Sequence, residues 1–161
     1  MNSKRLWGMA ALLVLLAFPA SASMVSFMLV ETGIDEEAPS TQYTSLWEGG
    51  LMAAFFDAGH IVTNSPITRM EKRPAQDLTG QVAVDLDEAA IGGAEYFVVG
   101  YLEYRVEGVN VFPVGMALKV YTTGSRKLIY EQGFAAGRGK DLNEEYQFAQ
   151  NAGRALISHI K

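Results

Sequence analysis

Residues 92–100 have the sequence Gly-Gly-Ala-Glu-Tyr-Phe-Val-Val-Gly. The small residues come first, and Tyr96, Phe97, Val98 and Val99 then follow without a polar residue between them. In an extended chain neighbouring side chains point to opposite faces, so both faces of this segment are apolar. A strand that is covered on both faces has this pattern. We therefore expect residues 92–100 to contain the central strand of a sheet.

The residues before this strand alternate between strand and helix patterns. An apolar run at 24–30 predicts a buried first strand, and the β-branched segment 60–64 predicts a second. Between them, apolar residues recur at helical spacing at Tyr43, Leu46, Trp47, Leu51, Ala54, Phe55 and Ala58. Gly49 and Gly50 each cost such a helix about 1 kcal/mol, which suggests close approach of its backbone to the sheet. We expect 67–76 to be an exposed connection and 79–90 to be a weaker helix.

The residues after Gly100 predict an antiparallel meander and a closing helix. Apolar and charged residues alternate from Leu102 onward, a turn follows at 108–110, and strands are expected at 111–122 and 126–135. Asp141 and Glu144 have the spacing of a capping box for the last helix. The order is β-α-β-α-β-β-β-α, which predicts an α/β fold with a single mixed sheet, strand order 2-1-3-4-5, and helices packed on it.

The first residues are typical of a secretory signal peptide. Lys4 and Arg5 precede an uncharged run at 6–18, and Ala20-Ser21-Ala22 follows. We expect a signal peptide at 1–22, cleavage between Ala22 and Ser23, and a single periplasmic domain at 23–161. The alternative is an uncleaved anchor, but a bilayer-spanning helix needs about 20 apolar residues and this run is shorter.

The composition limits where the protein can work and which partners it can bind. The chain has no cysteine, which excludes disulfides, thiolate metal sites and a lipid-bearing cysteine. We therefore expect a periplasmic or secreted protein with no membrane span after signal removal. The net charge is −5, and loss of Lys4 and Arg5 would make it more negative still, so we expect no nucleic-acid partner.

The sequence contains no pattern that predicts catalysis or metal binding. His60 has only Asp57 near it as a further ligand, and His159 suits a helix C-terminus. The glycine-rich segment 133–139 lacks the lysine and hydroxyl residues of a phosphate-binding loop. Glu103 and Glu107 share one strand face, which leaves a carboxylate-based envelope hydrolase as an alternative function. We expect no catalytic, cofactor-binding or metal residues.

Two motifs carry a resemblance to a known group. Residues 93–100, Gly-Ala-Glu-Tyr-Phe-Val-Val-Gly, are similar to a strand of the cell-envelope α/β domains found in the amino-terminal part of TolB, in the curli secretion protein CsgG and in the penicillin-binding-protein activator LpoB. Residues 120–124, Val-Tyr-Thr-Thr-Gly, and 128–131, Leu-Ile-Tyr-Glu, resemble their hairpin. The chain departs from the group because it lacks a lipoprotein cysteine and a propeller, and its 108–110 loop is too short for a membrane-inserting segment.

The resemblance implies a non-catalytic, TolB-like accessory domain that binds another cell-envelope protein in an assembly role. A small-ligand-binding periplasmic protein is the main alternative, and the sequence leaves homo-oligomerisation open. For the partner surface we expect an exposed face of the meander, where tyrosines lie beside mixed charges. Its residues by strand parity are Tyr101, Glu103, Arg105, Lys119 and Tyr121. The alternative is an ordinary solvated sheet face.

Overall fold

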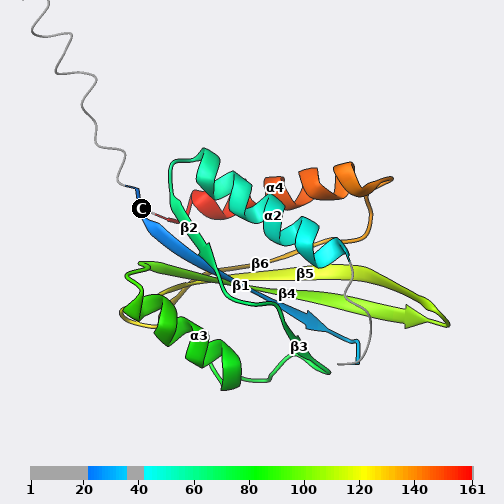
Figure 1. The fold of residues 1–161 in the computed structure, drawn as a ribbon, viewed down its shortest axis with the longest axis horizontal. Helices are drawn as coiled ribbons and strands as arrows, with labels where there is room; N and C mark the ends of the chain where they lie inside the picture. The colour runs from blue at the N-terminus through cyan, green and yellow to red at the C-terminus, as the bar shows by residue number, and fades with distance from the viewer. Residues whose placement is uncertain (1–21, 36–41, 161) are drawn as a thin grey trace, which may run out of the picture.

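A computed structural model describes residues 22–35 and 42–160 of the chain (Figure 1). Its elements are β1 (Met24–Thr32), α2 (Gln42–Asp57), β2 (Ile61–Asn64), β3 (Thr68–Met70), α3 (Gly80–Ile91), β4 (Tyr96–Glu107), β5 (Asn110–Thr122), β6 (Leu128–Phe134) and α4 (Leu142–Ile157). The predicted α/β fold with a single mixed sheet is confirmed. Nearly all of the predicted signal peptide, residues 1–21, lies outside the described residues, so that prediction stays untested.

The sheet has the order β2-β1-β4-β5-β6, with β3 also paired to β1. β1 pairs in parallel with β2, β3 and β4, and the strands from β4 to β6 pair antiparallel. The five predicted strands therefore lie in the predicted order. The difference is β3, which forms within the segment 67–76 that we expected to be an exposed connection. β1 extends two residues beyond its predicted end, to Thr32, and this extension gives β3 an edge to pair with.

The helices cover the two faces of the sheet unequally (Figure 1). α2 and α4 lie side by side on one face, and their buried side chains share a core with Phe27, Val98 and Leu118 of the sheet. α3 lies alone on the other face and packs on a smaller core that includes Phe97 and Val99. Since one helix cannot cover five strands, part of this second face is left for other segments to cover.

The two glycines of α2 have different surroundings. A Cβ on Gly50 would lie 2.6 Å from the Cβ of Ala149 and 2.9 Å from the carbonyl oxygen of Tyr146, both in α4. A Cβ on Gly49 would meet only the Tyr146 ring, at 3.7 Å. Close approach at Gly50 is therefore confirmed, but its partner is α4, and the expectation that these glycines face the sheet is wrong. Sequence periodicity could not distinguish the two because α2 packs on the sheet and on α4 at once.

The β4–β5 hairpin continues beyond the rest of the sheet (Figure 1). β1 pairs with β4 only as far as Glu103, and β6 pairs with β5 only from Met116. Residues 105–112, which we call the arm, therefore pair only with each other within the described part of the sheet. The arm is a two-stranded ribbon, a structure that is marginally stable without further support.

Candidate functional site

The five residues predicted for partner binding do lie on one face of the meander. The sheet register pairs Val99 with Lys119 and Phe97 with Tyr121, so both partners face the α3 side. Glu103 and Arg105 are exposed, as expected. The expected exposure of the other three is wrong, because Tyr101 is 2% exposed, Tyr121 3% and Lys119 5%. Whether this face binds a partner stays a prediction.

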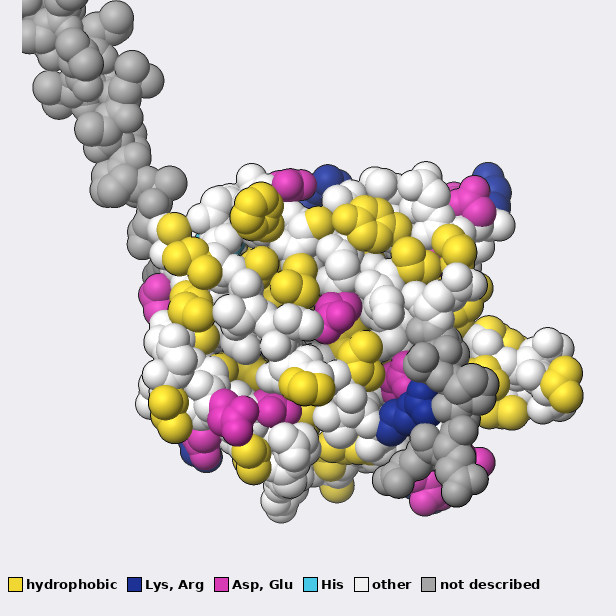
Figure 2. Space-filling model, viewed as in Figure 1, with side chains coloured by type: hydrophobic (Ala, Val, Ile, Leu, Met, Phe, Trp, Pro, Cys, Tyr) yellow, Lys and Arg dark blue, Asp and Glu magenta, His cyan; other side chains and the backbone are white. Residues whose placement is uncertain are grey.

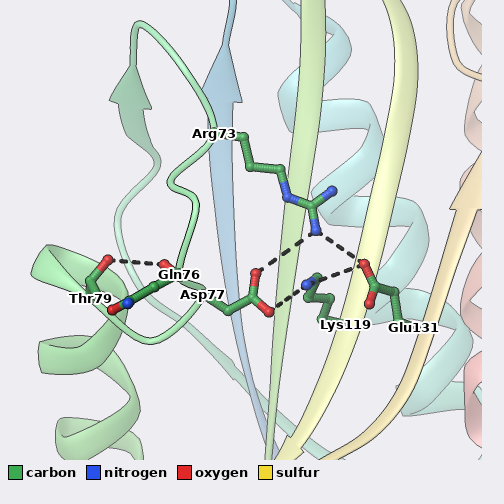
Figure 3. A network of polar contacts seen from close by, with 6 residues as sticks. All are labelled: Arg73, Gln76, Asp77, Thr79, Lys119 and Glu131. Atoms are coloured by element: carbon green, nitrogen blue, oxygen red, sulfur yellow. Dashed lines mark hydrogen bonds and ion pairs between the residues drawn. The ribbon is translucent and has the colours of Figure 1, made fainter.

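Residues 71–79, which we call the strap, cover these three side chains together with α3, whose buried residues share a core with both tyrosines. The strap leaves β3 and enters α3, and its Arg73 and Asp77 side chains reach over the sheet toward Lys119 of β5 and Glu131 of β6 (Figure 3). The Arg73 guanidinium carbon lies 4.8 Å from the centre of the Tyr101 ring, within the range of a cation–π contact. No periodic apolar pattern marks the strap in the sequence, and its connection to the sheet is instead made by charged side chains.

Two cations and two carboxylates tie the strap to β5 and β6 (Figure 3). The Lys119 ammonium donates to Asp77 at 2.5 Å and lies 3.1 Å from the Glu131 carboxylate. The Arg73 guanidinium donates to the same Glu131 carboxylate at 3.1 Å and lies 3.9 Å from Asp77. Each carboxylate therefore faces both cations, so the network needs no outside counter-ion to balance the buried Lys119.

The network changes the acidity of its members. Burial alone would raise the pKa of Asp77, but the hydrogen bond and charge of Lys119 outweigh burial and hold this pKa below its usual value. The same balance, with help from Arg73, lowers the pKa of Glu131. Burial, reinforced by the negative charge of Asp77, raises the pKa of Tyr101 to about 12 and also raises the pKa of Tyr121. At neutral pH both tyrosines are thus neutral beside the ionised carboxylates of Asp77 and Glu131.

Beyond the strap the same face opens into a groove of about 620 Å³. Its floor is made of small residues of β5 and β6, Gly115, Ala117 and Gly133, with Met116 and Phe134 beside them. Its walls carry charges of both signs, from Glu71, Lys72 and Arg73 of the strap and from Glu103 of β4. The groove exists because the side chains that follow Lys119 and Glu131 on this face, at Ala117 and Gly133, are too small to fill it. Tyr101 and Glu103, two of the predicted residues, line the groove.

A buried carboxylate that the sequence analysis missed fixes the start of the strap. Glu31 is 1% exposed at the end of β1, and its carboxylate accepts hydrogen bonds from Thr44 of α2 and, at 2.5 Å, from Arg69 of β3. The Thr44 hydroxyl also lies 2.7 Å from the Tyr104 hydroxyl of β4. The sequence does contain a signal for this contact, because Glu31 directly follows the apolar run 24–30. A carboxylate that is buried with its strand needs a hydrogen-bond or charged partner.

The glycine-rich loop after β6 is occupied by a carboxylate of the chain itself. Glu145 of α4 is 1% exposed and accepts hydrogen bonds from the backbone N–H groups of Gly137 at 2.7 Å and Gly139 at 3.0 Å. It also accepts one from the Trp47 indole at 2.8 Å. Backbone donors that could otherwise bind an anion are therefore used to hold the loop against α4 and α2.

The histidines take part in ring contacts. His60 lies 5.7 Å from Phe55 between ring centres, and His159 stacks on Tyr130 at 3.9 Å. Within residues 22–35 and 42–160, no group of three or more His, Asp or Glu side chains is placed to hold a metal ion. In the same residues, no helix combines the length and apolar character that a membrane span requires.

Comparison with known proteins identifies the fold. No family model matches the chain, and no curated protein sequence matches it. PelC from Paraburkholderia phytofirmans, solved as a dodecamer, matches with a TM-score of 0.51 at 16% identity, over 86% of this chain and 91% of PelC. A variant of that dodecamer matches with a TM-score of 0.50 at 14% identity, over 83% of this chain and 87% of that one. These similarities show a shared fold.

The resemblance to TolB and LpoB inferred from the sequence is also found among solved structures. The LpoB C-terminal domain from Salmonella enterica matches over 81% of this chain and 94% of its own, with a TM-score of 0.45 at 12% identity. TolB from Acinetobacter baumannii matches over 88% of this chain, with a TM-score of 0.43 at 10% identity. This chain spans 29% of that TolB chain.

Proposed function

We propose that this chain is a non-catalytic domain of the cell envelope that binds a segment of another envelope protein in the groove beside the strap. The observation that carries the proposal is the groove itself, a preformed hollow with a Gly and Ala floor on the sheet face that α3 leaves open. The predicted signal peptide supports an envelope location. The fold that the chain shares with PelC supports its assignment to domains of this architecture.

The chemistry of the groove suits a polypeptide. Its floor is apolar and lies beside β6, the last strand of the sheet, while its rim carries both positive and negative side chains. Protein recognition surfaces combine an apolar centre with a polar rim in this way. Because Lys72 on one wall and Glu103 on the other have opposite charges, an extended segment with both kinds of charge fits the groove better than a uniformly acidic or basic one.

The non-catalytic part of the proposal is supported by the contacts of the buried glutamates. Glu31 and Glu145 are the two glutamates buried among the described residues, and both accept hydrogen bonds that join structural elements. Acid–base catalysis needs a group within reach of a substrate, and each of these is engaged by the chain's own donors. Glu103 and Glu107, the remaining carboxylate pair considered above, are exposed.

The proposal includes self-association. PelC, which shares this fold, was solved as a dodecamer. A domain that assembles from identical copies would present the groove several times on one particle, and repeated sites increase the overall strength of binding.

The proposal is tested by filling the groove from its floor. A Cβ on Gly133 meets no atom within 4 Å, so Gly133→Tyr places a ring in the groove without a backbone clash. Gly124 is equally open but lies in the β5–β6 turn away from the groove, and Gly124→Tyr is the matched control. After crosslinking in cells, we expect a partner that wild type and Gly124→Tyr capture equally and that Gly133→Tyr captures at least tenfold less. Equal capture by all three would refute the proposal.

A small ligand is the second candidate for the same groove. Its volume lies in the range of small-molecule pockets, and the buried hydroxyl of Tyr101, one of its lining residues, has no hydrogen-bond partner among the described residues. Native mass spectrometry of protein purified from the envelope separates the two candidates. A retained molecule of defined mass that Gly133→Tyr expels would favour a ligand over a protein segment.

A further inference from the structure

We infer that the arm is a self-association element, and that its apolar end docks into an apolar pocket on α4 of a second copy of this chain. The inference deepens the self-association part of the proposed function and does not depend on the groove. It rests on an exposed apolar projection, a pocket of matching character elsewhere on the same molecule, and a complementary pair of charges.

The end of the arm is apolar and uncovered. Val109 is 96% exposed at the turn, and Val106 is 51% exposed on the adjoining strand. Figure 2 shows the arm projecting from the body of the molecule with hydrophobic side chains at its end. A ribbon of this kind gains no support from a third strand, so burying its valines against another surface would stabilise both the ribbon and the contact.

The pocket lies where α4 meets the end of β6. It has a volume of about 290 Å³ and is lined mainly by apolar side chains, which are Trp47, Phe134, Ala135, Phe148 and Ala152, with Arg138 at its edge. Liquid water occupies about 30 Å³ per molecule, so the pocket is large enough for an aliphatic side chain. Binding of an apolar side chain in such a pocket is favourable, because the apolar surfaces of both leave water.

Charge complementarity selects a second copy as the occupant. Glu107, two residues before Val109, is exposed and lies 4.0 Å from Arg105 of the same arm, in an ion pair open to solvent, and Arg138 is exposed at the edge of the pocket. When Val109 enters the pocket of another copy, these opposite charges approach each other. A lipid surface is disfavoured because Glu103 and Glu107 outnumber Arg105 on the outer part of the hairpin, which leaves a net negative charge that anionic headgroups repel.

The arm and the pocket are different surfaces of one molecule, so the contact is heterologous. Such contacts join copies head to tail, and they build a closed ring when the rotation between copies closes. The same geometry prevents a copy from satisfying its own pocket with its own arm, since the arm points away from the body of the molecule (Figure 1).

The cysteine-free chain allows a direct test by crosslinking. The full chain is expressed and the protein purified with Val109→Cys and Ala135→Cys together, then oxidised and separated on a non-reducing gel. We expect a ladder of covalent multimers. The control pair, Val109→Cys with Val84→Cys, uses an exposed residue of α3 outside the pocket and should give no ladder. A ladder from both pairs, or only an internally crosslinked monomer from the first, would overturn the inference.

Sedimentation analysis tests the same contact without crosslinks. We expect wild type to form oligomers, Val109→Asp to weaken association at least tenfold, and Val84→Asp to leave it unchanged. Glu107→Arg and Arg138→Glu should each weaken association, and the double exchange should restore it. Oligomers that persist in Val109→Asp would refute the role of the arm and leave the proposed self-association standing, whereas a monomeric wild type would refute both. A monomer that floats with phosphatidylglycerol vesicles through Val109 would assign the arm to lipid and also overturn the inference.

Discussion

Alanine substitution at the two adjacent glycines of α2 should have opposite effects on stability. At Gly50 the new methyl group would lie 2.6 Å from the Ala149 Cβ and 2.9 Å from the Tyr146 carbonyl oxygen, distances that non-bonded atoms do not adopt. α2 and α4 must separate to relieve the overlap, and overpacking of this kind costs about 1–3 kcal/mol or more. The gain in helix propensity returns at most about 1 kcal/mol. We expect Gly50→Ala to lower the free energy of unfolding by about 1–2 kcal/mol.

Gly49→Ala is the matched control. Its methyl group would sit 3.7 Å from the Tyr146 ring, an ordinary van der Waals distance, so the propensity gain of up to about 1 kcal/mol is retained. The two variants should therefore differ by about 2–3 kcal/mol. Urea unfolding followed by the fluorescence of Trp47, which is buried beside this interface, measures both. Equal stabilities, or a Gly50→Ala protein more stable than Gly49→Ala, would refute the close packing of α2 on α4.

Three further predictions follow from the buried polar groups. The pKa values of Asp77 and Glu131 are lowered in the folded protein, so both carboxylates stabilise the fold above their unfolded pKa values, which lie near 4. This stabilisation is lost as the pH falls through the folded pKa values. Protection against hydrogen exchange in the strap should therefore fall below about pH 4 and stay unchanged between about pH 6 and 8. The pKa of Tyr101 is about 12 in the folded protein, so its phenol ionises more readily in the unfolded chain, and the free energy of unfolding should fall between about pH 10 and 12. Tyr101→Phe removes a buried hydroxyl that has no partner, so the variant should lose less stability over this pH range, and a phenolate absorbance titration of the wild type should show one tyrosine that ionises late. Glu145→Gln should cost about 1–3 kcal/mol and shift the Trp47 emission, because an amide cannot accept all the hydrogen bonds of the carboxylate; an unchanged spectrum and stability would argue against the Glu145 contact.

Local patterns were enough to predict five of the six strands and their order, and they missed β3. The unbroken run from Tyr96 to Val99 identified the central strand because a strand covered on both faces has no polar side to show. The capping pair was also visible, and the Asp141 side chain does accept a hydrogen bond from the Glu144 backbone N–H. Both features depend only on residues that are close together in the chain, which is why they can be predicted from the sequence.

The strap could not be predicted in the same way. Its contacts join Arg73 and Asp77 to residues more than 40 positions away, and no period or motif marks them. Alternation placed Tyr101, Lys119 and Tyr121 correctly on one face, but alternation says only which face a side chain occupies. Whether that face is covered depends on the path of a connecting segment, and this is a tertiary property.

Photocrosslinking from the floor of the groove tests the proposed function most directly. A photoreactive phenylalanine analogue placed at Gly133 in living cells faces the groove, and the same group at Gly124 faces solvent at the β5–β6 turn. The groove account predicts a covalent adduct between position 133 and one envelope protein, which position 124 does not give. Adducts of equal yield from both positions, or none from position 133 while the protein remains folded, would contradict it.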